Sequence, residues 1–309
     1  MSTRRIVLSA LALHSLGACA PLNPGVPGSP AVTYPAIDGT VFTIVFENQN
    51  ADDVLVPALP TFYELAGSYG RADAYVSHHH PSLANYIVMT SGTTHGIASS
   101  QGPESNPVQI TDTEHLVTQF EEAGIPWRAY MEGMGEPCGL RSDGRYAANH
   151  DPFVYYRSFT DDTERCREHV VDFDAHFADD LAANRYRYMW ITPDHCNDMH
   201  DCPTSVGDAW LGRLLPTILS SEGYLAGGVV FILFDEGYLR LGGAGANLAT
   251  LVLSPRLVAR PYATNTRFDH RSYLATIEDI FGLPRLPTTV DAVPMSEFFV
   301  RRSIDGAGE

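Results

Sequence analysis

Residues 228–237 read GVVFILFDEG, an unbroken apolar run that ends in two adjacent carboxylates. Runs of β-branched and aromatic residues without polar alternation are typical of strands that are buried on both faces of a sheet. The run stops at Asp235 and Glu236, whose side chains repel each other unless a cation or a proton relieves the repulsion. This segment therefore predicts a deeply buried strand with a charged site at its carboxyl end.

A second segment of the same kind, residues 41–46 (VFTIVF), is followed at once by Glu47 and Asn48. Helical and strand-like patterns alternate through the rest of the chain. We expect further strands at 74–76, 126–131, 186–192 and 248–253, and helices at 59–67, 82–90, 113–123, 170–183, 208–221 and 271–281. The alternation, with apolar strands throughout, predicts an α/β fold: one domain with a mainly parallel sheet covered by helices on both faces.

The composition limits the partners of this chain. It has 309 residues, 44% of them hydrophobic, which is enough for one large domain or two small ones. The formal net charge of −17 argues against nucleic acid or anionic lipid head groups as bulk partners. A small phosphorylated substrate stays compatible with this charge, because groups inside a site, including a bound metal ion, set the local field.

The first residues have the pattern of an export signal. Two arginines precede an apolar run at 6–16 that is too short to span a bilayer, so we expect a signal peptide over residues 1–18. Residues 16–19 (LGAC) resemble the lipobox of bacterial lipoproteins, which implies a lipid on Cys19 as the only membrane attachment. A plain secretory signal is the alternative. Both interpretations place the mature protein outside the cytoplasm, in the periplasm, on the cell surface or secreted.

Segments poor in core-forming residues flank the expected domain. Residues 19–38 are rich in Pro and Gly, so we expect a flexible linker that carries the lipid anchor. Residues 303–309 are expected to be a disordered tail. The folded domain is therefore expected over residues 39–302.

The cysteines other than Cys19 are even in number, which in an exported protein favours disulfides. They are Cys138, Cys166, Cys196 and Cys202, and they allow three pairings. We favour Cys138–Cys166 together with Cys196–Cys202, because the second pair closes a short loop within one segment. A cysteine-based zinc site is the alternative, although no CxxC spacing supports it.

Polar clusters follow the apolar strands at Glu47-Asn48, at residues 194–201 and at Asp235-Glu236. In an open α/β sheet the ligand crevice lies at the carboxyl ends of the strands, so these clusters are expected to meet. Their carboxylate and amide oxygens suit Ca²⁺, Mg²⁺ or Mn²⁺, or with histidines Zn²⁺ or Fe. Three histidines beside aspartates are candidate general acids, phosphate contacts or ligands: His150, His200 and His270.

Residues 77–97, SHHHPSLANYIVMTSGTTHGI, contain the candidate nucleophile. The pattern predicts a helix from Ser82 to Thr90 that ends at Gly92. Ser82 would then lie among free backbone N–H groups at the positive end of the helix dipole, with the amide of Asn85 one turn along on the same face. An ordinary helix capped by a serine is the alternative. The histidine run at 78–80 is expected to be structural.

Several segments together resemble the bacterial phosphoesterase family of secreted acid phosphatases and non-haemolytic phospholipases C, within the alkaline-phosphatase-like superfamily. The resemblance spans roughly residues 40–285, and its most specific parts are HPSLANY and CNDMHD. The matching segments are FEN at 46–48, HPSLANY at 80–86, GTTHGI at 92–97, WRAYME at 127–132, HDPF at 150–153, CNDMHD at 196–201, FDEG at 234–237, and Asp269-His270 with TIED at 276–279.

The resemblance implies a role for each candidate residue. Ser82 would be a nucleophile that forms a phosphoenzyme, and Asn85 would hold a phosphate oxygen. One divalent metal ion, Ca, Mg, Mn, Zn or Fe, would bind at Glu47, Asn48, Asp235 and Glu236. The three histidines named above would surround the phosphoryl group or protonate the leaving oxygen. Relatives often carry Asn at Asp151 and Asp194, and the extra charge here leaves substrate preference open.

The activity implied is hydrolysis of phosphate monoesters, with a small phosphate ester or a phospholipid head group as substrate. A phospholipase C-type phosphodiesterase is the first alternative, although family members of that kind are much longer and carry C-terminal domains. A non-catalytic lipoprotein that binds phosphate compounds is the second alternative. The sequence leaves the oligomeric state open.

Overall fold

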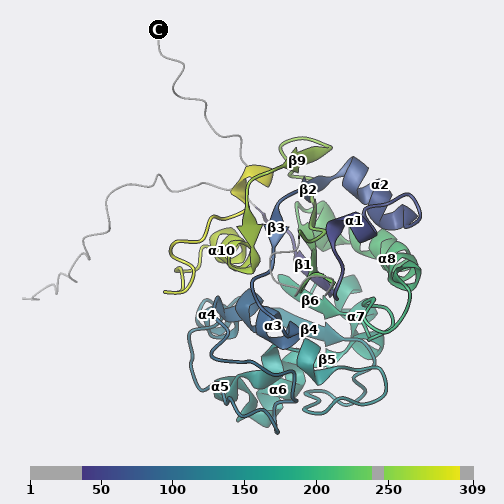
Figure 1. The fold of residues 1–309 in the computed structure, drawn as a ribbon. Coiled ribbons are helices and arrows are strands. Elements are labelled where there is room, and N and C mark those ends of the chain that lie inside the picture. Colours follow the sequence, from purple (N-terminus) through teal and green to yellow (C-terminus); the bar gives the residue numbers. More distant parts are fainter. Residues whose placement is uncertain (1–36, 239–246, 300–309) are drawn as a thin grey trace, which may run out of the picture. The chain divides into compact units, whose positions relative to one another are not determined.

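The computed structural model describes residues 37–238 and 247–299 of the chain (Figure 1). The expected signal peptide, the lipid-bearing Cys19, nearly all of the linker and the C-terminal tail lie outside the described residues.

An eight-stranded sheet forms the centre of the described chain. In spatial order its strands are β5 (Val170–Asp172), β4 (Trp127–Met131), β6 (Tyr188–Thr192), β1 (Val41–Phe46), β7 (Val229–Phe234), β8 (Leu251–Leu253), β2 (Gly70–Ala72) and β9 (Tyr262–Thr264). Only the pairs that include β8 are antiparallel among the pairings within this sheet. A separate parallel pair joins β3 (Tyr75–Val76) to β10 (Phe268–Asp269). The predicted mainly parallel α/β fold is confirmed.

Strand β1 shows why both faces of the sheet need helices. All of its residues are buried, and successive side chains point to opposite faces. The Thr43 hydroxyl lies 2.6 Å from the hydroxyl of Tyr273 in α10 (His270–Phe281). On the other face, the ring of Phe46 packs 5.3 Å from Phe62 of α2 (Pro60–Ser68) and 6.0 Å from Trp210 of α8 (Thr204–Leu219). Side chains of helices therefore cover both faces of this strand.

The helices lie on either side of the strands (Figure 1). Besides α10 they are α1 (Ala51–Val54), α2 (Pro60–Ser68), α3 (Ser82–Ser91), α4 (Leu116–Glu122), α5 (Arg157–Thr160), α6 (Thr163–His169), α7 (Phe173–Ala182), α8 (Thr204–Leu219) and α9 (Glu222–Leu225). Short 3₁₀ turns occur at Ala148–His150, Phe153–Tyr155 and Ser296–Phe298. Across the described ranges, none of the helices has the length and apolar character that crossing a bilayer requires.

Two predicted element boundaries were wrong in an informative way. Residues 170–172 form β5, an edge strand paired with β4, whereas the sequence predicted a helix over 170–183. The helix starts only at Phe173, because the Asp172 carboxylate accepts from Ala175 N and caps it. Likewise α4 begins at Leu116 instead of residue 113, since His115 occupies the capping position.

Both favoured disulfides are present, Cys138–Cys166 and Cys196–Cys202. The second closes the segment between β6 and α8, and that segment contains the CNDMHD sequence. The disulfide therefore restrains a loop at the carboxyl end of a central strand.

Candidate active site

A cavity of about 470 Å³ opens where β1 and β7 end and α3 begins. Its lining combines strand-end residues with the start of α3: Asn48, Gln49, His80, Pro81, Ser82, Ser100, Asn149, His195, His200, Glu236 and Tyr238. Residues from all three predicted polar clusters and from the serine-containing segment thus share one cavity.

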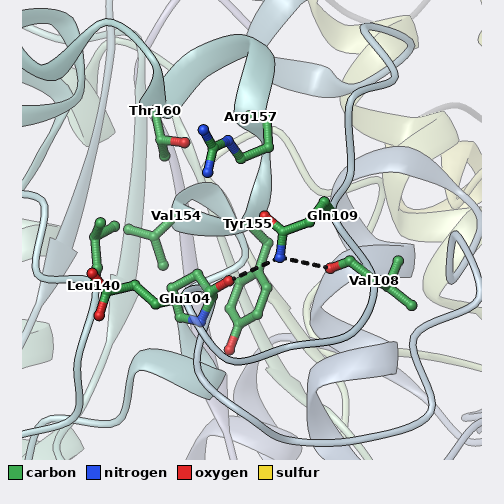
Figure 2. Close-up of a pocket in the computed structure, with 9 residues that line it drawn as sticks. Glu104, Val108, Gln109, Leu140, Val154, Tyr155, Arg157 and Thr160 are labelled. Atoms are coloured by element: carbon green, nitrogen blue, oxygen red, sulfur yellow. Dashed lines mark hydrogen bonds between the residues drawn. The ribbon is translucent and has the colours of Figure 1, made fainter.

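A smaller hollow elsewhere is no competitor for the substrate. It lies beside the side chains of Glu104, Gln109 and Arg157, and Gln109 donates to backbone oxygens next to it (Figure 2). Its volume is only about 30 Å³, which is roughly the share of one water molecule in the liquid.

Ser82 is the first residue of α3, and Pro81 precedes it as the capping residue. The Ser82 hydroxyl does not cap the helix. It donates to Glu47 Oε2 at 3.0 Å and lies 3.5 Å from Glu236 Oε1. Gly92 ends the helix with φ 73°, as predicted for a residue that must adopt the left-handed region. The hydroxyl is therefore oriented by carboxylates, which an ordinary capped helix does not require.

Besides Ser82, two side chains of the segment before and within α3 contact Glu236. His80 Nδ1 lies 2.7 Å from Glu236 Oε1, and Asn85 Nδ2 donates to Oε2 at 3.4 Å. Asn85 also donates to the carbonyl of His79 at 3.0 Å. The expectation that the histidine run is structural does not hold for His80, which lines the cavity and contacts a predicted metal ligand.

Asp235 and Asn48 meet at the ends of the two central strands. Asp235 Oδ1 accepts from the Asn48 backbone N–H at 3.1 Å, and Asn48 adopts the left-handed region with φ 52°. Asn tolerates this conformation better than most residues, and here it turns the chain at the end of β1. The two predicted metal ligands therefore come from adjacent strands and lie together.

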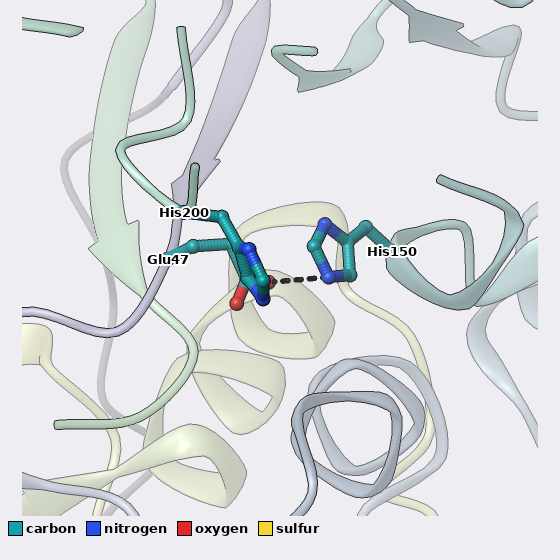
Figure 3. A group of neighbouring side chains, drawn as sticks. All are labelled: Glu47, His150 and His200. Carbon is teal, nitrogen blue, oxygen red and sulfur yellow. Dashed lines mark ion pairs between the residues drawn. The ribbon is translucent and has the colours of Figure 1, made fainter. Parts of the chain in front are cut away.

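Glu47 connects the serine to a buried histidine. Its Oε1 lies 3.3 Å from His150 Nε2, and His150 Nδ1 lies 3.2 Å from Asp198 Oδ2. Figure 3 shows the Glu47 and His150 side chains facing each other with His200 beside them. One ligand atom from each of these three residues falls within 4.8 Å of the others, so histidines join the carboxylates as candidate metal ligands.

His200 lies in the cavity wall with a second histidine that the sequence reasoning did not select. Asp201 contacts both rings: His200 Nδ1 at 2.7 Å and His195 Nδ1 at 3.3 Å. The two rings stack with centroids 4.8 Å apart. His195 falls inside the polar segment 194–201, so position in that segment was the only available signal. These three residues form a second group with metal-ligand spacing.

His270 differs from the other predicted histidines. Its Nε2 lies 2.6 Å from the backbone oxygen of Asp235, and its Nδ1 lies 3.0 Å from the Tyr75 hydroxyl. Burial lowers the pKa of His270 to about 4. Both ring nitrogens are thus engaged inside the protein, next to Asp235, and neither is directed to the phosphoryl group as the sequence led us to expect.

The acidic groups of the site fit a cation. Burial raises the pKa of Glu47, and the nearby charges of Asp235 and Asp198 raise it further. Burial and the charge of Asp235 raise the pKa of Glu236 to about 7. Among the described residues, Asp235 Oδ2 is buried without a hydrogen-bond partner, and the buried Glu47 Oε1 makes no hydrogen bond although it lies 3.3 Å from His150 Nε2. Carboxylates that repel one another in this way are relieved by a bound divalent cation.

Ionisation of Glu236 is expected to destabilise the metal-free protein as the pH rises from about 4.5 to about 7. The Glu236 carboxyl has a pKa of 4.5 in the unfolded chain and about 7 in the fold, so its ionisation favours the unfolded chain across this window. Buried histidines such as His270, whose pKa is lowered, act in the opposite direction, so the effect is measured as the difference between thermal melts of chelated wild type and chelated Glu236→Gln at several pH values. Wild type should lose stability relative to the variant as the pH rises, and a difference that stays constant across the window would contradict this.

The sequence of this chain is similar to those of known phosphoesterases. A sequence model described as "Phosphoesterase family" matches residues 55–284. The chain is 29% identical over 220 residues to a phosphate-repressible acid phosphatase of Penicillium chrysogenum, covering 69% of this chain and 52% of that protein. It is 24% identical over 261 residues to a phosphatidylinositol-3-phosphatase of Mycobacterium tuberculosis, covering 84% and 82%. The chain thus spans about half the length of the fungal acid phosphatases it matches.

Solved structures with the same fold have little sequence in common with this chain. A protein of the alkaline phosphatase superfamily from Vibrio parahaemolyticus superposes with a TM-score of 0.61 at 10% identity, covering 85% of this chain and 71% of that one. A phosphonate monoester hydrolase from Silicibacter pomeroyi gives a TM-score of 0.55 at 12% identity, covering 84% and 76%. The alkaline-phosphatase-like part of the fold prediction is confirmed.

Proposed function

Because the chain belongs to the phosphoesterase family, we propose that it hydrolyses phosphate monoesters through a phosphoserine formed on Ser82. The observation that carries this proposal is the Ser82 hydroxyl itself, which opens α3 inside the cavity and donates to Glu47 Oε2 at 3.0 Å. A serine kept only for capping would bond to its own helix instead.

In the first step of this proposal Ser82 Oγ, as the alkoxide left when its proton passes to solvent, forms a bond to phosphorus while the bond between phosphorus and the leaving oxygen breaks. Glu47 Oε2 orients the hydroxyl and is its closest carboxylate acceptor, at 3.0 Å against 3.5 Å for Glu236. The amino-terminal end of α3 favours negative charge on the phosphoryl oxygens. Phosphoryl transfer requires mainly positioning and charge stabilisation, and both are available at this helix end.

The predicted ligands Glu47, Asn48, Asp235 and Glu236 suit a divalent cation. The group of Glu47, His150 and His200 is the alternative ligand set, and His200 acts as a general acid only when it does not bind the ion. Such a cation would supply positive charge that lowers the pKa of the serine hydroxyl and offsets charge on the phosphoryl group. Its identity stays open, because oxygen ligands favour Ca²⁺, Mg²⁺ or Mn²⁺ and the histidines favour Zn²⁺ or Fe.

His200 is the proposed general acid for the leaving oxygen. Asp201 holds its Nδ1, which leaves Nε2 as the nitrogen for proton transfer, and the ring lines the cavity. After the alcohol leaves, the same nitrogen takes a proton from the water that attacks the phosphoserine. We propose that His150 and His270 take no part in proton transfer. His150 orients the Glu47 carboxylate, and His270 orients the backbone of Asp235.

Asn85 is buried beside the cavity and not part of its lining, and its Nδ2 donates to His79 O and Glu236 Oε2, so its substitution tests whether the predicted phosphate contact forms with substrate bound. Asn85→Ala should lower kcat by about 10²–10³-fold, as for one oxyanion donor. Asn106→Ala is the matched control, because Asn106 is also buried but bonds to backbone oxygens of its own loop. Equal activity of the two variants would remove Asn85 from the substrate site.

A comparison of p-nitrophenyl phosphate with bis-p-nitrophenyl phosphate and p-nitrophenyl phosphocholine separates the candidate activities. The proposal predicts the monoester as the better substrate by kcat/KM. Preference for a diester would favour the phospholipase C alternative. Binding of phosphate esters without turnover, with each candidate metal supplied, would favour the non-catalytic lipoprotein.

Export is part of the proposal. Two disulfides in the described chain suit an oxidising compartment. We propose that the signal peptide over residues 1–18 directs export and that Cys19 carries the lipid. Metabolic labelling with a fatty acid, compared between the native chain and Cys19→Ser, tests the anchor.

A further inference from the structure

The carboxylate of Glu132, just after β4, does not line the substrate cavity and yet is bound to the loop that carries the site histidines. It accepts from the Asp194 backbone N–H at 2.8 Å and from Trp210 Nε1 at 3.0 Å. Asn197 Nδ2 donates to both of its oxygens, at 2.9 and 3.0 Å. Glu132, Asn197 and Trp210 also line a separate cavity beside Phe173.

The bonded loop residues continue directly into the site. The Asp194 backbone oxygen accepts from Asp198 N at 2.8 Å. Asp198 then contacts three parts of the site: its backbone oxygen accepts from Glu47 N at 2.9 Å, and its carboxylate contacts His150 Nδ1 at 3.2 Å and His200 N at 2.8 Å. The conformation of this loop therefore sets the positions of Glu47, His150 and His200 together.

The loop packs closely against α8. An added Cβ at Gly207, in the first turns of α8, would lie 2.6 Å from the Met199 side chain and 2.7 Å from the Asn197 backbone oxygen. Met199 itself adopts the left-handed region with φ 78°. A strained backbone conformation persists only when surrounding contacts hold it. The Glu132 carboxylate provides such contacts, because it bonds to Asn197 of the loop and to Trp210 of α8.

We propose that Glu132 is a positioning residue for phosphoester hydrolysis: by clamping Asp194 and Asn197 it places Asp198, and through Asp198 it sets Glu47, His150 and His200. This inference rests on the function proposed above, because it needs these three residues to act in the reaction. Within the part of the chain that the structure describes, the Glu132 carboxylate is hydrogen-bonded to Asp194, Asn197 and Trp210 and to none of the three residues that it sets, so its effect travels through the loop.

The test compares Glu132→Gln with Glu136→Gln, the same substitution at an exposed glutamate that pairs with Arg167. Each Glu132 oxygen accepts two hydrogen bonds, one from Asn197 and one from Trp210 or Asp194, so the NH₂ group of Gln removes two of the four and the loop shifts. We expect kcat on p-nitrophenyl phosphate to fall about 10–100-fold with KM nearly unchanged, as for residues that orient metal ligands. Glu136→Gln should retain full activity.

A double variant distinguishes positioning from general loss of stability. In Glu132→Gln with Asn197→Asp, the glutamine NH₂ donates to the new carboxylate, so the bond is restored with its direction reversed. We expect kcat to recover by about tenfold relative to Glu132→Gln. If Glu132→Gln does not fold, Trp210→Phe takes its place in the test. This substitution removes the Trp210 Nε1 donor and keeps an aromatic ring at the position. We expect kcat to fall several-fold.

The results separate this inference from the proposed function. If Ser82→Ala is inactive while Glu132→Gln, or Trp210→Phe in its place, keeps wild-type kcat, positioning by Glu132 is refuted and the function stands. A double variant no more active than Glu132→Gln also refutes it. If Ser82→Ala retains activity, the proposed function fails regardless of the behaviour of Glu132.

Discussion

Ser82→Ala should remove turnover of p-nitrophenyl phosphate, lowering kcat by roughly four to six powers of ten, as the loss of a covalent nucleophile does in other hydrolases. The reason is the position of the Ser82 hydroxyl. Ser82 Oγ is a hydroxyl in the cavity that donates to Glu47 and lies at the start of α3. Alanine keeps the helix and its dipole but has no oxygen to attack phosphorus.

The control for this variant is Ser91→Ala. Ser91 is buried in the same helix, and its hydroxyl donates to the Ile87 backbone oxygen at 2.9 Å instead of a site carboxylate. It should lose some stability and keep kcat. If Ser82→Ala remains folded and turns over substrate at a rate close to that of Ser91→Ala, the nucleophile assignment is wrong.

Asp235→Asn should reduce both metal content and activity. Asp235 has one oxygen bound to Asn48 N, and the other is buried without a partner among the described residues. A cation that stabilises the transition state by several kcal/mol corresponds to a loss of about two to four powers of ten in kcat once it is gone. Metal analysis of purified protein, with kinetics in limiting and saturating metal, measures both effects.

Two further variants make this test specific. Asp180→Asn replaces a buried aspartate that pairs with Arg128 and Arg185, so it should lower stability and leave metal content unchanged.

His200→Ala separates the candidate ligand sets: metal content persists if oxygen ligands dominate and falls if the group of Glu47, His150 and His200 holds the ion. Full metal content and full activity in Asp235→Asn would remove this residue from the ligand set.

The sequence was sufficient to predict the central strands β4, β6, β1, β7 and β8 and the strand-end carboxylates, because their signals are local, but β2, β5 and β9 were not predicted. Residues 41–46 and 229–234 are continuous apolar runs, and parallel pairing brings their ends, Glu47 and Asp235, to one edge. The edge strand β5 was missed because its three residues read as the first turn of the helix that follows. Pairing with β4 decided their conformation, and no local pattern carries that information.

The parts of the site that were missed depend on contacts between distant segments. His80 gains its role from Glu236, which is 156 residues away in the chain, and Glu132 gains its role from a loop more than 60 residues away. His270 was selected because an aspartate precedes it, but the fold directs its ring to Tyr75 and to the Asp235 backbone. Residue type and neighbours in sequence indicate which side chains are reactive, and only tertiary packing decides where they point.

The most direct test of the account is to trap the intermediate. The purified protein is mixed with p-nitrophenyl phosphate, quenched in acid, digested and analysed by peptide mass spectrometry. We predict one added phosphoryl group on the peptide that contains Ser82, assigned to that serine by fragmentation and absent in Ser82→Ala. A phosphoryl group on another residue, or steady-state turnover with inversion of configuration at phosphorus, would contradict the phosphoserine mechanism.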